Sequence, residues 1–313
     1  MRMARYDRYG PPEVLYVATV PRPEPSPRQV LVRVRAVSVN GGELRIRSGG
    51  LALLGGRRFP KTLGVDFVGE VVARGAKVST VTVGERVWGV LPRLATESNA
   101  EYVVVDPGRL SPAPADLDPV EAVTLLAGGT TGITALRDHA RLRTNERVLV
   151  RGAAGGVGSV VVQLAKARGA HVTALAREAN LGFVRGLGAD VALDHHAHGP
   201  ADLGAFDVII DCVGTDVPDY RALLAPRGRM VAIAFGTVRD LGHIVGSTVY
   251  GRGRVRFFSG NPKRPLLSEL AGLVEGGRVR PVVDTVYELD DVAAAHRALE
   301  AGGVRGKHVV RVD

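Results

Sequence analysis

The fold is decided by residues 147–165, which read RVLVRGAAGGVGSVVVQLA. Three consecutive apolar residues at 148–150 are typical of a parallel strand buried on both faces, and glycines follow at once. From Val157 onward the apolar side chains recur at the spacing of one helical face. The stretch therefore predicts a strand, a glycine turn and a helix, which is the first half of a nucleotide-binding βαβ unit.

The glycine turn predicts a site for a dinucleotide. Residues without a Cβ let the backbone approach a ligand closely, and a helix start presents unpaired N–H groups and a positive dipole end. Against the pattern G-x-G-x-x-G, alanine stands in the first glycine position, and no Gly-Lys-Ser/Thr of a nucleotide hydrolase follows. An ordinary strand-to-helix turn is the alternative. The residues predicted to hold the pyrophosphate are Ala153, Ala154, Gly155, Gly156, Val157 and Gly158.

The choice of dinucleotide depends on the residue that ends the second strand, predicted over residues 171–176. Arg177 stands there and favours the 2′-phosphate of NADPH, which is the predicted cofactor. Glu178 follows and would instead bind the ribose 2′-hydroxyl of NADH if the strand ended later. Arg177 as a plain solvated loop residue is the third possibility.

Composition excludes several classes of protein. The 313 residues suffice for two domains, and of 41 basic residues only five are lysines, with the arginines scattered among acids. The net charge of +9 therefore indicates no nucleic-acid partner. A single cysteine, Cys212, excludes an intrachain disulfide. No secretion signal or membrane-spanning apolar run is present, so no membrane association and a cytoplasmic location are expected.

Two patterns of elements follow each other along the chain. Residues 1 to about 118 predict an all-β, barrel-like domain, with strands at 30–37, 69–74 and 102–105. From Pro119 strands and helices alternate, which predicts an α/β domain with a doubly wound parallel sheet. Its later strands are expected at 190–194, 206–214, 229–234 and 254–258. The residues expected beside the nicotinamide, at the carboxyl ends of these strands, are Val213, Gly214, Ala234, Phe235 and Gly236.

The tail after Pro262 predicts a helix over 266–275, a strand near 282–283, a helix over 292–301 and a last strand over 307–312. Asp290 and Asp291 are expected to cap the second helix, and Gly302 to end it. Periodicity alone leaves open which domain this tail completes.

The order of short motifs resembles the medium-chain dehydrogenase/reductase superfamily, in particular its zinc-independent quinone oxidoreductases and enone reductases. The matching motifs are Y-G-x-P-E-V-L at 9–15, N-x-x-E-x-x-x-R-x-G at 40–49, L-G-x-D-x-x-G-x-V at 63–71, G-x-T-A at 132–135, the glycine turn, Q-L-A-K at 163–166 and L-G-A-D at 187–190. The resemblance implies that the tail returns to the front. It gives a GroES-like substrate domain of residues 1–119 and 263–313 around a Rossmann domain of residues 120–262.

The resemblance also bears on metals. Zinc-dependent members carry ligands where this chain has Asn40, Val65 and Asp66, and they also carry a cluster of four cysteines. Three protein ligands with an open fourth position cannot be built from these residues, so no metal is expected. The spacing of the three histidines at 195–198 falls in a predicted surface loop, where solvated side chains are the favoured interpretation.

Hydride transfer from NADPH to a quinone, or to the activated double bond of an α,β-unsaturated carbonyl, suits a site without a Lewis acid. The resemblance places Asn40 beside the nicotinamide as the expected catalytic residue, with a turn before Gly41 as the equal alternative. It also places Thr130 and Thr134 against the cofactor. Glu43 and Arg47, four residues apart, are expected to form a structural pair.

Two rival functions stay open. One is a biosynthetic tailoring enzyme that reduces or reductively cyclises one particular enone. The other is a protein that binds NADPH without turnover, as a sensor, structural or RNA-associated protein. The sixth strand, near residues 255–258, is a possible sheet edge, and relatives pair such edges, so a homodimer is expected.

Overall fold

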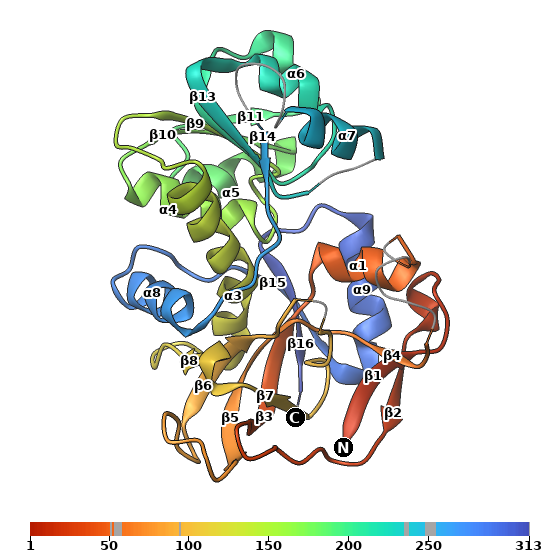
Figure 1. The fold of residues 1–313 in the computed structure, drawn as a ribbon. Coiled ribbons are helices and arrows are strands. Elements are labelled where there is room, and N and C mark those ends of the chain that lie inside the picture. The colour runs from red at the N-terminus through yellow and green to blue at the C-terminus, as the bar shows by residue number, and fades with distance from the viewer. Residues whose placement is uncertain (51, 53–57, 94, 235–237, 248–254, 313) are drawn as a thin grey trace. The chain divides into compact units, whose positions relative to one another are not determined.

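The computed structural model describes residues 1–50, 52, 58–93, 95–234, 238–247 and 255–312. The chain divides into two compact units (Figure 1). Unit 1 comprises Met1–Ala127, Asn261–Gly277 and Pro281–Asp313, and unit 2 comprises Gly128–Gly260 and Arg278–Arg280. Most of the chain after residue 260 is therefore part of the unit that the first 127 residues form.

Unit 1 is built on a seven-stranded sheet in which the path β15-β16-β3-β5-β6-β8 is continuous and β7 also pairs with β3. Only β15 and β16 are parallel; the other pairs are antiparallel. The last strand of the chain pairs with β3, with Val310 opposite Val37. The strands are β3 (Val30–Ser38), β5 (Asp66–Arg74), β6 (Arg86–Val90), β7 (Tyr102–Val105), β8 (Leu110–Pro112), β15 (Val283–Glu288) and β16 (Lys307–Arg311).

A second sheet of unit 1 has the order β2-β1-β4, formed by β1 (Arg2–Tyr6), β2 (Tyr16–Thr19) and β4 (Lys61–Thr62). Among the described residues, the helices that lie wholly in the unit are α1 (Gly41–Ser48), α8 (Arg264–Glu275) and α9 (Val292–Ala301). Side chains from both sheets and from α9 form one apolar core, in which Tyr6, Leu63 and Phe67 are fully buried. Helix α3 (Pro119–Ile133) leads from unit 1 into unit 2 and continues as a π-helical turn over Thr134–His139.

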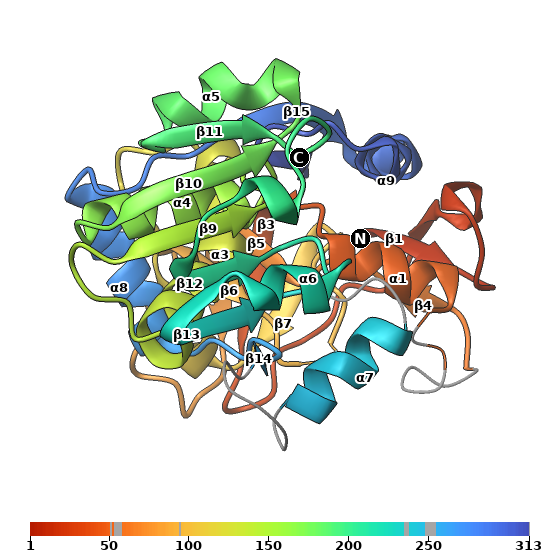
Figure 2. The same ribbon diagram turned by 90° about the horizontal axis from the view of Figure 1, so that it is seen from above.

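Unit 2 contains a six-stranded, wholly parallel sheet in the order β11-β10-β9-β12-β13-β14. The strands lie side by side in Figure 2. They are β9 (Arg147–Arg151), β10 (His171–Ala176), β11 (Val191–Asp194), β12 (Phe206–Asp211), β13 (Leu224–Ala232) and β14 (Val255–Phe257). The chain starts in the middle, runs outward to β11, returns to β12 and runs to the other edge. This order confirms the predicted doubly wound α/β sheet.

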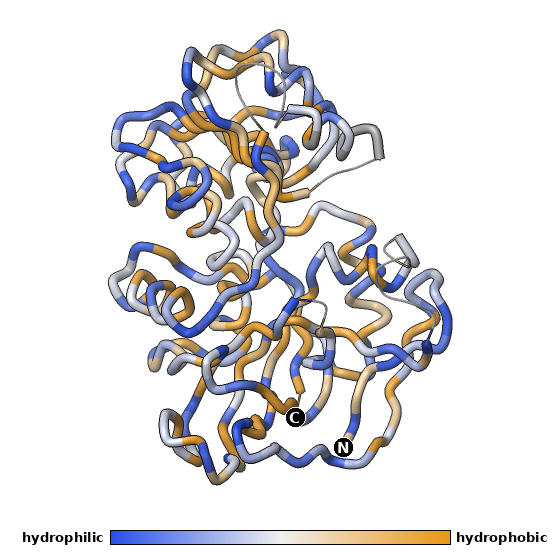
Figure 3. Tube along the Cα trace, viewed as in Figure 1, coloured by the Kyte–Doolittle hydropathy of each residue, from blue (hydrophilic) through white to orange (hydrophobic). Residues whose placement is uncertain are grey.

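The helices of unit 2 are α4 (Gly158–Ala167), α5 (Leu181–Gly186), α6 (Val217–Ala222) and α7 (Val238–Ser247). Apolar residues concentrate in the strands, and the connecting loops are mostly hydrophilic (Figure 3). Leu149, Ile209 and Met230 belong to a buried cluster that also includes Val217 and Tyr220 of α6. Because neighbouring residues of a strand face opposite ways, both faces of this sheet need apolar side chains.

Two expectations about local structure are wrong, and a third is correct in place but too short. The front of the chain is not all-β, because α1 follows Asn40 and ends at Gly49, whose φ of 91° suits glycine. Asp291 stands before α9 but makes no capping hydrogen bond, because residues 289–291 already form a 3-10 turn. The strand expected near 282–283 is longer and extends to Glu288 as β15.

Candidate functional site: a glycine cradle and a buried polar cluster

The glycine turn of unit 2 is as tight as its sequence requires. Gly152 follows β9 with a φ of 68°, a backbone region that side chains disfavour. An ideal Cβ on Gly158 would lie 2.2 Å from the carbonyl oxygen of Gly152, so α4 can begin this close to the strand only with glycine. A Cβ on Gly128 of α3 would lie 2.2 Å from the carbonyl oxygen of Gly156, so this helix also packs directly on the turn.

The same turn leaves an open cradle in front of α4. A Cβ on Gly155 would meet nothing closer than 3.6 Å, in contrast to Gly158. The N–H groups of Gly156, Val157 and Gly158 donate to no other described residue. Unpaired N–H groups at the start of a ten-residue helix favour an anion. Side chains at Ala153 and Ala154 are buried, so the turn offers mainly backbone to a ligand.

Arg177 and Glu178 stand next to each other, directly after β10. Arg177 is exposed, and its guanidinium forms no hydrogen bond or ion pair with a described residue. Glu178 is also exposed and opens a 3-10 turn. Strands β9 and β10 are parallel neighbours, so the end of β10 lies at the same edge of the sheet as the glycine turn. An uncommitted cation is therefore available where a ribose phosphate would need one.

A buried ion pair fixes the backbone that follows β12. Oδ1 of Asp211 accepts hydrogen bonds of 3.0 Å from the N–H groups of Val213 and Gly214, and Oδ2 lies 3.0 Å from a guanidinium nitrogen of Arg151. Burial raises the pKa of Asp211, whereas the charge of Arg151 opposes that rise. Val213 is exposed and lies against Gly152, at the cradle.

For the remaining residues predicted to contact a cofactor, the structure gives burial and local hydrogen bonds but no feature that points to a ligand. Ala234 is half-buried just beyond β13, and Phe235 and Gly236 lie outside the described residues. Thr130 is buried in α3. The hydroxyl of Thr134 donates a 2.8 Å hydrogen bond to the carbonyl of Thr130, so it already has an acceptor within its own helix.

Unit 1 contains a cluster of buried polar side chains around Asn40, which is itself half-buried. The amide nitrogen of Asn40 donates to the carbonyl of Ser38 at 3.0 Å and to Oε1 of Glu43 at 2.9 Å. Its Oδ1 accepts a hydrogen bond from the ammonium of Lys307. Asn40 stands at the N-cap position of α1 but makes no capping hydrogen bond. The amide therefore links β3, α1 and β16 through contacts that the sequence did not predict.

Ionisable groups in this cluster are almost fully buried. The carboxylate of Asp66 accepts hydrogen bonds of 2.9 Å and 2.7 Å from the N–H and hydroxyl of Ser38, and Oε2 of Glu43 accepts one of 3.2 Å from the N–H of Gly64. Burial raises the pKa of Glu43 to about 8 and also raises that of Asp66. Burial lowers the pKa of Lys307, although the charges of Asp66 and Glu43 oppose this shift.

Sequence reasoning missed Lys307, the only cation named in this cluster among the described residues, because it lies 267 positions after Asn40. The expected pair of Glu43 and Arg47 is wrong. The buried guanidinium of Arg47 instead binds the carbonyl of Gly10 and the carboxylate of Glu300 on α9. Helical spacing alone could not show that Glu43 turns toward β16 while Arg47 turns toward α9.

Within the described ranges, no group of three or more His, Cys, Asp and Glu side chains is placed to hold a metal ion. In the same part of the chain, every helix is too short or too polar to cross a bilayer.

Two family models match the chain. The model described as "Alcohol dehydrogenase GroES-like domain" matches residues 26–115, within unit 1. The model described as "Zinc-binding dehydrogenase" matches residues 187–310. The first match confirms the predicted GroES-like character of the front of the chain.

Known proteins match along the whole chain. A mitochondrial NAD(P)H oxidoreductase of Homo sapiens (RTN4IP1) is 32% identical over 98% of this chain and 88% of its own. A chloroplast envelope quinone oxidoreductase homolog of Arabidopsis thaliana is 29% identical over 99% of this chain and 98% of its own. The solved structure of the quinone oxidoreductase from Coxiella burnetii has a TM-score of 0.93 and 30% identity, covering 100% of this chain and 99% of that one. The chain therefore belongs to the medium-chain dehydrogenase/reductase superfamily, in its quinone oxidoreductase branch.

Proposed function

We propose that this protein is an NADPH-dependent, zinc-independent oxidoreductase that reduces a quinone or the activated double bond of an α,β-unsaturated carbonyl. The observation that carries the proposal is the pairing of an open backbone cradle at Gly155–Gly158 with the guanidinium of Arg177, which has no partner among the described residues. Backbone N–H groups suit a pyrophosphate, and a free arginine suits a 2′-phosphate. A bound reduced nicotinamide would supply a hydride.

Each residue has a defined part in this proposal. The cradle residues hold the pyrophosphate, while Arg177 selects the phosphorylated ribose. Asp211 and Arg151 act as positioning residues, because they fix the backbone at Val213 and Gly214 that we propose to lie beside the nicotinamide ring. In this proposal Thr130, Thr134 and Ala234 also contact the cofactor, as the sequence predicts.

Asn40 is the proposed contact for the acceptor. Within its cluster it is more exposed than Glu43, Asp66 and Lys307, so it is the member that an acceptor can touch. The ammonium of Lys307 donates a hydrogen bond to its Oδ1, so a positive charge lies next to the amide. Such a charge stabilises the anion that forms on the acceptor oxygen when a hydride is added. Water is the proposed source of the proton that completes the reduction.

Cofactor selection is tested by calorimetric titration with NADP⁺ and NAD⁺, without any turnover. The wild-type protein is expected to bind NADP⁺ at least about tenfold more tightly, because charge-assisted hydrogen bonds contribute about 1.5–3 kcal/mol. Arg177→Ala is expected to abolish this preference, whereas the matched variant Glu178→Ala is expected to keep it. Tighter binding of NAD⁺ that is lost in Glu178→Ala would assign the ribose contact to Glu178 and refute the role of Arg177.

Turnover is tested by following NADPH absorbance with a panel of quinones and enones, with and without a chelator. Activity that persists with chelator supports a zinc-independent reductase, and Asn40→Ala is expected to lower kcat while NADP⁺ affinity is unchanged. Reduction of one enone and no quinone would favour the biosynthetic tailoring enzyme. Tight NADPH binding without any turnover would favour the non-catalytic role.

The homodimer and the cytoplasmic location remain proposals. The strand β14 pairs only with β13 among the described residues, which leaves its other edge available to a second copy of the chain. Light scattering at micromolar concentration is expected to give twice the mass of 33.0 kDa. A monomer under these conditions would refute the pairing.

A further inference from the structure

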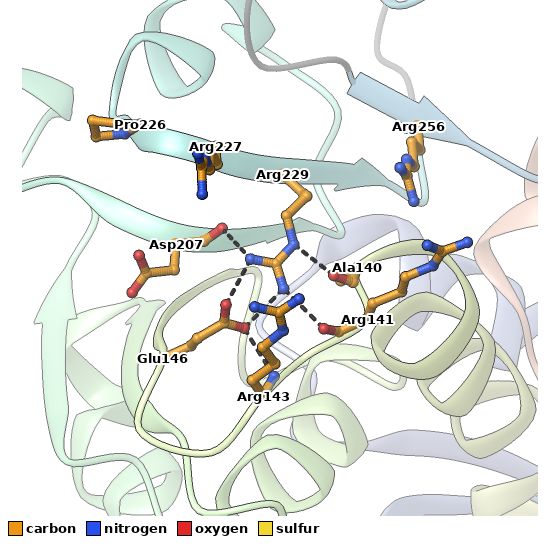
Figure 4. A pocket seen from close by; sticks show the side chains of 9 residues that line it. All are labelled: Ala140, Arg141, Arg143, Glu146, Asp207, Pro226, Arg227, Arg229 and Arg256. Atoms are coloured by element: carbon orange, nitrogen blue, oxygen red, sulfur yellow. Dashed lines mark hydrogen bonds and ion pairs between the residues drawn. The ribbon is translucent and has the colours of Figure 1, made fainter.

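A pocket of about 410 Å³ lies in unit 2 at the end of the sheet where the strands begin (Figure 4). Its walls come from the loop before β9, from the first residues of β12 and β13, and from β14. The lining residues are Ala140, Arg141, Arg143, Glu146, Asp207, Pro226, Arg227, Arg229 and Arg256. The glycine cradle follows the opposite end of β9, roughly 15 Å away along a five-residue strand. The pocket is thus separate from the proposed cofactor site.

Positive charge dominates this pocket, because its lining contains five guanidinium groups and two carboxylates. The carboxylate of Glu146 is already neutralised by Arg229, which donates to both of its oxygens at 2.8 Å. Burial alone would raise the pKa of Glu146, but the hydrogen bonds from Arg229 and Arg143 lower it overall. Asp207 accepts a 2.9 Å hydrogen bond from the N–H of Arg147. Both carboxylates therefore already accept hydrogen bonds from neighbouring residues.

Three of the arginines have no such partner. The guanidinium groups of Arg141, Arg143 and Arg227 form no hydrogen bond or ion pair with another residue in the described ranges, whereas Arg256 binds the carbonyl of His139. Arg143 and Arg227 point toward the middle of the pocket (Figure 4). Like charges gathered in one cavity repel one another, and the repulsion is relieved when an anion enters.

The backbone holds two of these arginines in an unusual conformation. Arg141 has a φ of 50° and Arg227 a φ of 69°, in the left-handed region that favours glycine. Non-glycine residues there cost about 1 kcal/mol each, and the surrounding structure must fix them. Glycine at either position would relieve this cost, so a variant can lose the guanidinium without losing the fold.

We propose that this pocket binds a small metabolite with a phosphoryl group and at least two negative charges. The volume suits a small molecule and is too small for a folded partner or a duplex. Guanidinium forks that approach from the loop before β9 and from β13 can surround a tetrahedral oxyanion, and each can donate two parallel hydrogen bonds to it. A planar carboxylate uses fewer of these directions.

The test uses inorganic pyrophosphate as the probe, in calorimetric titrations of the full chain at constant ionic strength. Citrate is the matched probe without phosphorus, and sulfate controls for a general salt effect. We expect pyrophosphate to bind more tightly than either, and Arg143→Gln/Arg227→Gly to weaken its binding at least about tenfold, the loss of two charge-assisted contacts. Arg28→Gln is the control, because Arg28 is exposed, belongs to unit 1 and has no described partner.

Pyrophosphate can also enter the cofactor cradle, so a second variant separates the two sites. Gly155→Ala, which places a methyl group in the cradle, is expected to leave the pyrophosphate affinity within about twofold, while Arg143→Gln/Arg227→Gly is expected to leave NADP⁺ affinity unchanged. Equal pyrophosphate binding by wild type and Arg143→Gln/Arg227→Gly would overturn the proposal. Citrate binding as tight as that of pyrophosphate would overturn the phosphoryl preference, and binding no tighter than that of sulfate would leave an adventitious ion only.

Discussion

The glycine cradle of unit 2 and the polar cluster of unit 1 differ in whether their polar groups have hydrogen-bond partners. The cradle at Gly155–Gly158 presents bare backbone, and the N–H groups of Gly156, Val157 and Gly158 have no partner among the described residues. The cluster around Asn40 buries ionisable side chains, and these satisfy one another through Ser38, Glu43 and Lys307. Backbone N–H groups without a partner can bind a ligand, whereas polar side chains that hydrogen-bond to one another hold the strands together.

This difference implies different responses to mutation. In the cradle, substitutions that add atoms are expected to be the disruptive ones, because the site depends on side chains being absent. In the cluster, removed atoms do the damage, because a buried ionised group that loses its partner retains the full cost of desolvation. The variants below test this contrast, beginning with the largest expected effect.

Gly158→Ala is expected to have the largest effect. The new Cβ would lie 2.2 Å from the carbonyl oxygen of Gly152, so strand and helix must move apart. Overpacking of this kind costs about 3 kcal/mol, and the cradle would lose its shape. Urea unfolding and titration with NADP⁺ measure the two consequences.

Gly155→Ala is the matched control for this variant. Its Cβ would have no neighbour closer than 3.6 Å, so the free energy of unfolding is expected to change by less than about 0.5 kcal/mol. The methyl group would nevertheless stand in the open cradle and weaken NADP⁺ binding. If Gly155→Ala bound NADP⁺ as tightly as the wild type, the cradle would not be the pyrophosphate site.

Lys307→Met is expected to cost about 2 kcal/mol of stability. The variant keeps the length of the side chain but leaves Asp66 buried without the cation that opposes its burial. The loss stays below that of a fully broken pair, because the raised pKa of Glu43 leaves its carboxyl protonated at neutral pH and Ser38 still binds Asp66. Urea unfolding of Arg311→Met, whose pair with Glu288 is exposed, is expected to show less than about 0.5 kcal/mol. Equal losses in both variants would contradict the cluster's role.

Apart from the control variants, Glu43→Gln is expected to have the smallest effect at neutral pH, about 1 kcal/mol, because one of the two N–H groups that donate to Glu43 loses its acceptor. Its informative consequence is the pH dependence. The pKa of Glu43 is about 8 in the folded protein and 4.5 when the carboxyl is exposed to water, so between these values the folded state holds a proton that the unfolded state releases. This contribution to stability is complete below pH 4.5 and is lost as the pH rises through 8.

The unfolding free energy of the wild type should therefore fall more steeply across this range than that of Glu43→Gln. One proton accounts for at most about 1.4 kcal/mol per pH unit. Urea unfolding at pH 5, 6, 7 and 8 measures both slopes. Parallel slopes for the two proteins would show that Glu43 is ionised throughout, and its hydrogen bond from Asn40 would then outweigh its burial.

Most of the sheet in unit 2 was predictable because each strand is a short apolar run between turn residues. The strands β10 and β12 begin where the sequence predicts, at His171 and Phe206. Prediction failed where tertiary contacts set the element. Helix α1 carries the polar residues Glu43 and Arg47 into the interior, so it lacks the apolar face by which a helix is recognised in sequence.

The two candidate sites were predictable to different degrees. The glycine turn depends on backbone conformation over a dozen neighbouring residues, which glycine and alanine positions report directly. The partners of Asn40 come from β3, α1 and β16, and sequence spacing gives no information about which of them meet. The arginine pocket before β9 likewise gathers residues from 140 to 256.

The sequence by itself determined the parallel sheet, the glycine turn and the family, because these follow from local periodicity and from the conformations that glycine allows. The tertiary structure alone decided that Lys307 contacts Asn40, that Arg47 pairs with Glu300, and that arginines without a described partner share one pocket. The physical reason is that charges interact through space. Their partners are fixed by how strands and helices pack, and not by their distance along the chain.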